Sequence, residues 1–170
     1  MDAVPDDPPL RLRPAAEADL DWIRALVTGE AAAPFLSTAA ADGLPAALAA
    51  GELVVVEAAG GGDRVGAACV ATVNRRSRIA AVQTLVVAPA ARGRGMGAAI
   101  LRAIARDAFG RGIHRLEAEV YGFNAAALRS FAAAGFTREG VRRRAYDRHG
   151  DWQDGVCFGL LAGEQGADAP

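Results

Sequence analysis

The stretch from Leu85 to Ala105 limits what this 170-residue chain can fold into more than any other. It begins with a short apolar run rich in β-branched residues, which is typical of a buried strand. Pro89 ends the run, because proline cannot donate a hydrogen bond to a neighbouring strand. Glycines and arginines then alternate, and apolar residues recur at helical spacing over 100–104. The stretch therefore predicts a strand, a glycine-rich turn and a helix, in that order.

The glycine-rich turn favours phosphate binding. A helix N-terminus leaves backbone N–H groups without partners and carries about half a positive charge. Because positions 93, 95 and 97 are glycine, a bulky anion can approach those N–H groups closely. Arg92 and Arg94 add forked cationic donors that suit a phosphate group. A flexible turn with solvated arginines is the alternative, but the strand before the turn and the helix after it favour phosphate or pyrophosphate.

Two common phosphate-binding loops fit this turn poorly. A Walker A loop requires a lysine, and all 19 basic residues of this chain are arginine. The dinucleotide-binding fingerprint is met by Gly93, Gly95 and Ala98, with Glu117 at a suitable distance, but residues 88–92 separate the glycines from the strand. That fold also alternates strands with helices, whereas the pattern before the turn predicts consecutive strands joined by short loops.

The remaining pattern predicts one domain over residues 10–162, with flexible tails over 1–9 and 163–170. Strands are expected at 10–13, 53–58, 65–73, 79–87, 116–120, 137–146 and 152–161, the last two joined around residues 147–151. Helices are expected over 20–27, over 39–50, from the glycine turn to 109, and from a cap at Asn124 to 134. A helix connects the strands at 79–87 and 116–120, so that pair should be parallel. The fold class is α/β, a mixed sheet with helices on both faces.

Two motifs resemble those of the GCN5-related N-acetyltransferases (GNAT). The glycine turn, Arg92-Gly93-Arg94-Gly95-Met96-Gly97, resembles the R/Q-x-x-G-x-G/A signature of a superfamily whose pyrophosphate ligand is acetyl-coenzyme A. Downstream, Asn124, Ala127 and Gly135-Phe136 resemble the second conserved block of this superfamily. Glu139-Gly140, Gly150 and Asp154 resemble the C-terminal part of one branch of the superfamily. That branch acts on ribosomal-protein N-termini, amino acids and polyamines. The resemblance implies a mostly antiparallel sheet in which the parallel strands four and five splay apart.

The resemblance also implies acetyl-CoA as co-substrate and assigns residues to it. Its pantetheine arm is expected between the splayed strands, paired with the backbone around Leu85, Val86 and Val87. The expected pyrophosphate-binding residues are Arg92, Gly93, Arg94, Gly95, Met96, Gly97 and Ala98. Asn124 should contact the pantetheine arm or a bound water, besides capping a helix. Phe131 is expected beside the cofactor, at the position where relatives often carry a proton-donating tyrosine.

Catalytic candidates follow from the same resemblance. Many relatives carry glutamate where this chain has Gln83, which can hold a water but cannot accept a proton. Glu119, beside the expected splay, is the best ionisable base, and Ser130 and Tyr121 are nearby hydroxyls that could donate a proton. A solvated strand face, strand packing or an exposed helix surface is the alternative for these residues. Deprotonation at pH 7 costs about 4.6 kcal/mol for a lysine-like amine and about 1 kcal/mol for a peptide α-amine, so the missing glutamate favours an α-amine acceptor.

The prediction is an acetyl-CoA-dependent N-acetyltransferase acting on a small-molecule amine, such as an amino acid, or on a protein N-terminus. Acetylation of an antibiotic or xenobiotic amine, and a non-catalytic acyl-CoA sensor, are the alternatives. In this superfamily the helical region 20–50 shapes the acceptor pocket, where Phe35 could lie, whereas Trp22 suits the core. Neither histidine has a partner at metal-ligand spacing, so no metal is expected.

Composition limits the partners and the location. A net charge of −1 gives no general attraction to nucleic acid or to an anionic membrane. No apolar run is long enough to span a bilayer, and the acidic, proline-rich N-terminus is unlike a signal peptide. Cys69 and Cys157 form no spaced pattern, so free thiols are expected. We therefore expect a cytoplasmic protein, and a homodimer stays open because similar proteins are frequently dimers.

Overall fold

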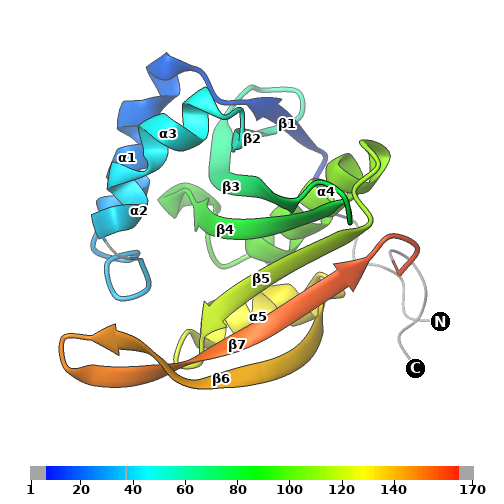
Figure 1. Ribbon diagram of the computed structural model, residues 1–170. Coiled ribbons are helices and arrows are strands. Elements are labelled where there is room, and N and C mark those ends of the chain that lie inside the picture. Colours follow the sequence, from blue (N-terminus) through cyan, green and yellow to red (C-terminus); the bar gives the residue numbers. More distant parts are fainter. Residues whose placement is uncertain (1–6, 37, 165–170) are drawn as a thin grey trace.

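A computed structural model describes residues 7–36 and 38–164, which fold around one seven-stranded sheet in the order β1-β2-β3-β4-β5-β7-β6 (Figure 1). The strands are β1 (Leu10–Pro14), β2 (Leu53–Ala58), β3 (Arg64–Asn74), β4 (Ile79–Val87), β5 (Arg115–Tyr121), β6 (Thr137–Arg148) and β7 (Asp151–Leu161). The helices are α1 (Leu20–Thr28), α2 (Thr38–Asp42), α3 (Leu44–Ala49), α4 (Met96–Gly110) and α5 (Ala125–Ala133), with 3-10 turns η1 (Glu17–Asp19) and η2 (Pro89–Ala91). The expected mixed α/β architecture is confirmed.

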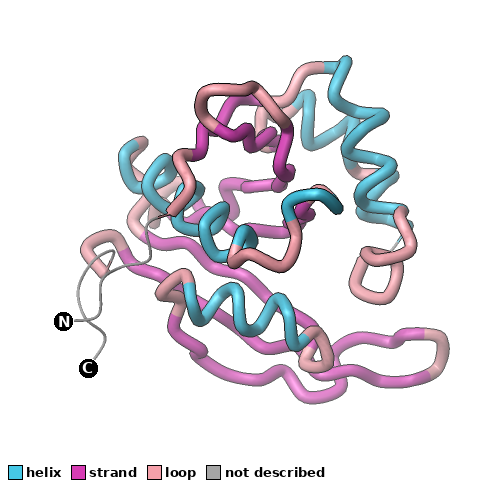
Figure 2. Tube along the Cα trace, turned by 180° about the vertical axis from the view of Figure 1, so that it is seen from behind, coloured by secondary structure: helices cyan, strands magenta, loops and turns pink. Residues whose placement is uncertain are grey.

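Helices cover both faces of the sheet (Figures 1 and 2). Neighbouring residues of β2 point to opposite faces, as the two-residue period of a strand requires. Val55 therefore packs in a cluster with α1, α2 and α3, while Val56 packs in a second cluster with α4 and α5. All strand pairs are antiparallel except β4 and β5, which are parallel and joined by α4 as predicted.

The single helix predicted over 39–50 is wrong, because the structure breaks it into α2 and α3 at Gly43. Pro45 explains the break. It has no N–H group, and its ring blocks the approach of the carbonyl four residues earlier, that of Ala41. Arg24 donates to this carbonyl instead, at 3.4 Å, so α1 satisfies the group that the broken helix leaves open.

The closing hairpin is longer than predicted, because β6 and β7 continue to Arg148 and from Asp151. The two-residue turn between them is His149-Gly150, and both residues have positive φ, 57° and 86°. Such a pair is the geometry of the tight turn that matches the twist of two antiparallel strands. The predicted loop over 147–151 is therefore too wide, and the hairpin reaches further beside the α1–α2 segment (Figure 1).

The N-terminal segment joins the domain before the predicted boundary at residue 10. The Asp7 carboxylate pairs with Arg102 on α4, and the Ala59 N–H donates to the Pro9 carbonyl at 2.8 Å. The remainder of the two predicted tails, 1–6 and 165–170, lies outside the described residues. Over 7–36 and 38–164, no helix has the length and apolar character needed to cross a membrane.

Candidate active site

The parallel strands β4 and β5 separate after a short contact. They pair only through Ile79 with Arg115, Ala80 with Leu116 and Ala81 with Glu117. On its other edge β4 stays paired with β3 as far as Val87. Beyond the contact, the edge of β4 that faces β5 therefore carries backbone groups that no strand satisfies, and a ligand can hydrogen-bond to them.

A bulge at Gln83 explains why the strands separate. Cys69 of β3 lies opposite Thr84 and Val70 lies opposite Val82, so Gln83 has no partner in the register. An extra residue bends a strand and increases its twist, which turns the second half of β4 away from β5. The Gln83 side chain lines the resulting cavity, and its Oε1 lies 3.8 Å from the Sγ of Cys69.

The direction of the backbone hydrogen bonds identifies which groups of β4 face the gap. The Ala88 N–H donates to the Val65 carbonyl of β3 at 2.8 Å. Because backbone groups alternate along a strand, the amide of Val86 also faces β3, and those of Leu85 and Val87 face the gap. The Val87 carbonyl accepts from Arg92 Nε at 3.0 Å, as this alternation requires. Leu85 and the N–H of Val87 thus offer the open backbone groups, because the Val87 carbonyl is held by Arg92, and the Val86 side chain is buried.

The glycine turn takes a conformation that favours glycine. Gly93 and Gly95 have φ of 82° and 71°, in the left-handed region, and Gly95 caps the start of α4. A Cβ added at either would meet nothing within 4 Å, so the space before the helix is open. Gly97 has a different task, because a Cβ there would lie 2.8 Å from Ser130 Oγ on α5. Residues 95–98 line a cavity, so the first turn of α4, whose N–H groups have no partner within the helix, borders open space, as an anion-binding site needs.

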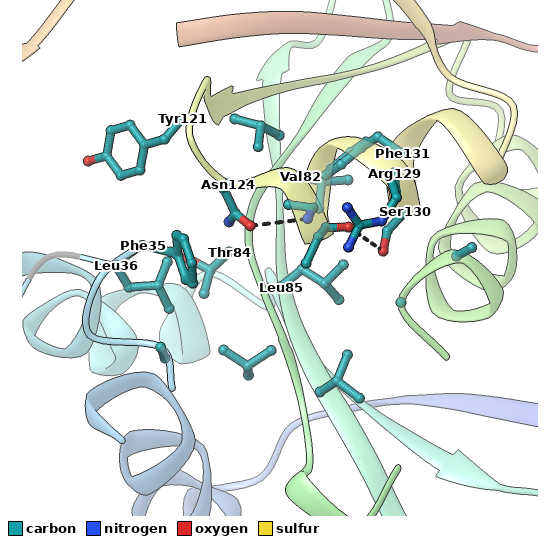
Figure 3. A pocket seen from close by; sticks show the side chains of 18 of the residues that line it. Phe35, Leu36, Val82, Thr84, Leu85, Tyr121, Asn124, Arg129, Ser130 and Phe131 are labelled. Atoms are coloured by element: carbon teal, nitrogen blue, oxygen red, sulfur yellow. Dashed lines mark hydrogen bonds between the residues drawn. The ribbon is translucent and has the colours of Figure 1, made fainter. Parts of the chain in front are cut away.

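One cavity of about 800 Å³ extends from this turn along the open edge of β4 (Figure 3). It brings together the three predicted catalytic residues, which are Gln83, Glu119 and Ser130. It also brings together nearly all predicted cofactor residues, namely Leu85, Val86, Val87, Arg92, Gly93, Gly95, Met96, Gly97, Ala98, Asn124 and Phe131. Among the described residues that were predicted for this site, Arg94 lies outside the lining, with its side chain exposed.

Helix α5 forms the wall of the cavity opposite β4. Asn124 caps α5, because its Oδ1 accepts from the Ala127 N–H at 3.1 Å, and its side chain reaches the cavity (Figure 3). Phe131 is buried, with its ring centroid 5.0 Å from that of Phe136. Ser130 donates to the Ala126 carbonyl at 3.0 Å. Since it also lies beside Gly97, Ser130 is at the end of the cavity nearest the glycine turn.

The opposite end of the cavity holds Glu119 on β5. Its carboxylate pairs with Arg142 of β6 at 2.8 Å, and its side chain is 24% exposed. Gly155 on β7 makes room for this carboxylate, because a Cβ there would lie 2.0 Å from Glu119 Oε1. The pocket lining includes Glu119 and Gln83, so a carboxylate and an amide lie at the end where the two strands begin to part.

Tyr146 belongs to the same end and is absent from the predicted catalytic set. Burial first, and then its hydrogen bond to Glu119, raise the pKa of the Tyr146 hydroxyl above its ordinary value. Its ring meets that of Tyr121 edge to face at 5.1 Å. A sequence signal existed, since Tyr146 lies in the closing hairpin, but its orientation depends on a bulge over residues 143–145 that no local pattern reveals.

The turns before α2, together with α2 itself, border this end from the other side. Phe35, Leu36 and Ala40 line the cavity there, so the expectation for Phe35 is confirmed (Figure 3). Trp22 instead packs against the cluster of α1, α2 and α3, with the Arg64 guanidinium 4.5 Å from its ring centroid. Cys69 and Cys157 are both free thiols, as expected, and burial raises the pKa of Cys69.

Comparisons with known proteins agree with this geometry. The model of the acetyltransferase (GNAT) family matches residues 20–136. The spermidine N-acetyltransferase from Vibrio cholerae, solved with CoA and spermine, is 21% identical, with a TM-score of 0.75 over 91% of this chain and 96% of that one. The ribosomal-protein-S5-alanine acetyltransferase from Vibrio fischeri is 17% identical, with a TM-score of 0.69 over 89% and 92%. A protein provisionally assigned as a phosphinothricin N-acetyltransferase is 24% identical, with a TM-score of 0.73 over 90% and 98%. Likeness at these identities establishes the shared fold.

Proposed function

The chain belongs to the acetyltransferase (GNAT) family, and on that premise we propose that it transfers an acetyl group from acetyl-CoA to a primary amine, either of a small molecule such as an amino acid or of a protein N-terminus. Enzymes of this family are N-acetyltransferases that use acetyl-CoA as the acetyl donor. The observation that carries the proposal is the single cavity that joins the N-terminus of α4 to the gap between β4 and β5. A long, thin ligand with an anionic end fits that shape.

In this proposal, the pyrophosphate of acetyl-CoA binds the N–H groups at the start of α4. The open space at Gly93 and Gly95 admits a bulky anion, and Arg92 adds a cation beside it. The pantetheine arm then extends along β4, where Leu85 and the N–H of Val87 offer backbone groups that β3 does not pair. This placement brings the thioester to the end of the cavity that holds Gln83, Glu119 and Tyr146.

The reaction forms a C–N bond and breaks a C–S bond, so the amine must lose a proton and the sulfur must gain one. Glu119 is the carboxylate that can accept the amine proton, directly or through a water held by Gln83. Ser130 keeps its hydroxyl on the Ala126 carbonyl near the glycine turn. We therefore assign proton donation to Tyr146, whose hydroxyl lies beside Glu119 and is protonated at neutral pH like that of any tyrosine. After donating to the sulfur, Tyr146 regains its proton from Glu119.

The test is release of free thiol from acetyl-CoA, measured against a panel of amino acids, peptides, polyamines and aminoglycosides. Thiol release with at least one amine is the expected result. Gly95→Glu should abolish it, because a carboxylate would then occupy the proposed phosphate site. Gly62→Glu is the matched control, since Gly62 in the β2–β3 loop has the same φ of 71° and equally open surroundings. Tight acetyl-CoA binding with no thiol release for any amine would contradict the proposal and favour a sensor.

A further inference from the structure

Two distant segments are in contact beside the end of the cavity farthest from the glycine turn. Arg148, near the tip of the β6–β7 hairpin, donates through Nη2 to the carbonyls of Ala33 and Pro34, at 3.0 and 2.8 Å. These carbonyls belong to the segment between α1 and α2. The Arg148 guanidinium also lies 5.5 Å from the ring centroid of Tyr121 on β5. One side chain therefore joins three elements around this end.

A row of aromatic rings makes a second bridge at the same place. Phe35 stacks on Phe123 with centroids 5.7 Å apart, and Phe123 stacks on Tyr121 at 5.4 Å. Tyr121 in turn meets Tyr146 of β6 edge to face. The row extends from the α1–α2 segment to the hairpin, and Figure 3 shows Phe35 and Tyr121 on the same side of the cavity. Phe35, Tyr121 and Tyr146 of this row line the cavity, and Arg148 lies against Tyr121 just outside the lining.

The lining at this end is poor in charge that could hold a cation. Phe35, Leu36 and Ala40 are apolar, and Glu119 is the one carboxylate among the described residues that line the cavity. Arg142 already pairs with it. An acceptor with a second ammonium group would lose hydration there without gaining a free carboxylate, which is unfavourable in a partly enclosed site.

Space favours a small acceptor as well. The cavity of about 800 Å³ includes the path along β4 that the pantetheine arm would take. Ligand sites of a few hundred to about 1,000 Å³ hold one drug-sized molecule, so the room beyond the thioester suits an amine of amino-acid size. The contact of Arg148 with the 33–34 carbonyls lies beside this room, since Arg148 approaches Tyr121, which lines the cavity.

We infer that the acceptor is a small primary amine with an apolar body and no second cationic group, such as a single apolar amino acid, and that Arg148 enforces this choice by holding the end of the cavity closed. The inference rests on the proposed function. It narrows the acceptor classes, because it excludes both a protein N-terminus and a polyamine. Arg148 is thereby a specificity-determining residue that need not touch the reacting atoms.

The experiment compares kcat/KM for leucine, for a tetrapeptide that begins with leucine, and for spermidine, with acetyl-CoA saturating. In the unmodified protein we expect leucine to exceed both by about tenfold or more. Arg148→Ala should lower the ratio of leucine to tetrapeptide by about fivefold, because it removes the bridge and admits the longer chain. Arg138→Ala, an exposed arginine of the same strand outside the 143–145 bulge, should leave that ratio unchanged.

The possible results separate the inference about the acceptor from the proposed acetyltransferase function. Equal or better turnover of the tetrapeptide or spermidine by the unmodified protein would overturn the inference while supporting the proposed function. A ratio that stays fixed in Arg148→Ala, with acetyl-CoA binding retained, would also overturn it. Absence of turnover with every amine would overturn the proposed function itself, and the inference with it.

Discussion

Glu119 and Asp19 are both carboxylates with arginine partners, yet their surroundings give them different tasks. Glu119 lines the cavity, where in the proposed mechanism it meets the substrate amine. Asp19 is 5% exposed and lies between Arg13, at 2.6 Å, and Arg64, at 3.3 Å. Its oxygen also accepts the Ala16 N–H at 2.9 Å, so the charge is held by several donors within the fold. We therefore expect substitution of Glu119 to affect catalysis and substitution of Asp19 to affect stability.

Glu119→Gln should lower kcat by about 10²-fold, because an amide cannot take a proton from the attacking amine. The same change should lower the pKa of Tyr146, since the hydrogen bond to the Glu119 carboxylate contributes to raising it. Ultraviolet titration in a Tyr121→Phe background, which leaves Tyr146 as the one tyrosine of the chain, measures that pKa. An unchanged Tyr146 pKa together with normal turnover would remove Glu119 from the proposed mechanism.

Asp19→Asn should cost about 2 kcal/mol in the free energy of unfolding at pH 7, because two arginines lose their anionic partner. The hydrogen bond from Arg13, more than any other contact, holds the pKa of Asp19 well below its usual range. Its contribution is therefore fully present above the unfolded-state pKa, near 3.9, and is lost as the pH falls through the folded-state pKa. In urea unfolding, the advantage of the unmodified protein over the variant should shrink by about 1 kcal/mol at pH 3.

The exposed Asp63→Asn, in the β2–β3 turn, is the control for Asp19→Asn and should change stability little at either pH. An Asp19→Asn difference that is the same at pH 7 and pH 3 would show that the carboxylate charge is not what stabilises this corner.

At the scale of elements, β2 and β4 could be predicted to the residue. Gly51 and Gly60 flank β2, the polar residues 74–78 precede β4, and Pro89 follows it. The bulges in β4 and β6 could not be predicted. The bulge at Gln83 and the one over 143–145 are relations between two strands, and register has no local signature in one strand. The same holds for Tyr146, whose place beside Glu119 follows from the second bulge. Pro45 did carry a local signal, and its missing N–H predicts the break between α2 and α3.

Asp154 holds the second bulge. Its Oδ1 accepts the Arg144 N–H at 2.8 Å, and Arg144 has a φ of 49°, unusual for a residue with a side chain. Asp154→Ala should release the bulge and displace Tyr146. We expect kcat to fall about tenfold, as for other small displacements of a catalytic group, with an unchanged KM for acetyl-CoA.

Asp154→Asn keeps an oxygen acceptor and should therefore restore most of kcat, and Asp151→Ala near the hairpin tip should change kcat little. If Asp154→Ala lowers only the melting temperature, and kcat per folded molecule stays normal, the positioning role is refuted.

At the scale of the molecule, the sheet consists of two parts that meet weakly. Strands β1 to β4 with α1, α2 and α3 form one part, and β5, β6 and β7 with α5 form the other. Three residue pairs of β4 and β5 join them, and α4 packs across both. The parallel pair was predictable from its connecting helix, but the point of separation was not, because the bulge in β4 sets it.

A ligand that binds in the gap should complete the sheet between these parts. With CoA at about 100 times its Kd, the free energy of unfolding should rise by about 2.7 kcal/mol, which corresponds to about 5–10 °C in Tm for a domain of this size.

Hydrogen exchange of the β4 amides gives a sharper test of where CoA binds. The amides of Leu85 and Val87 face the gap and should gain protection with CoA, whereas that of Val86 faces β3 and should already be protected without it. Gly95→Glu should remove both the Tm rise and the new protection, while Gly62→Glu keeps them. Equal gains at all three residues would instead indicate general tightening of β4, and the backbone pairing proposed for the pantetheine arm would then be wrong.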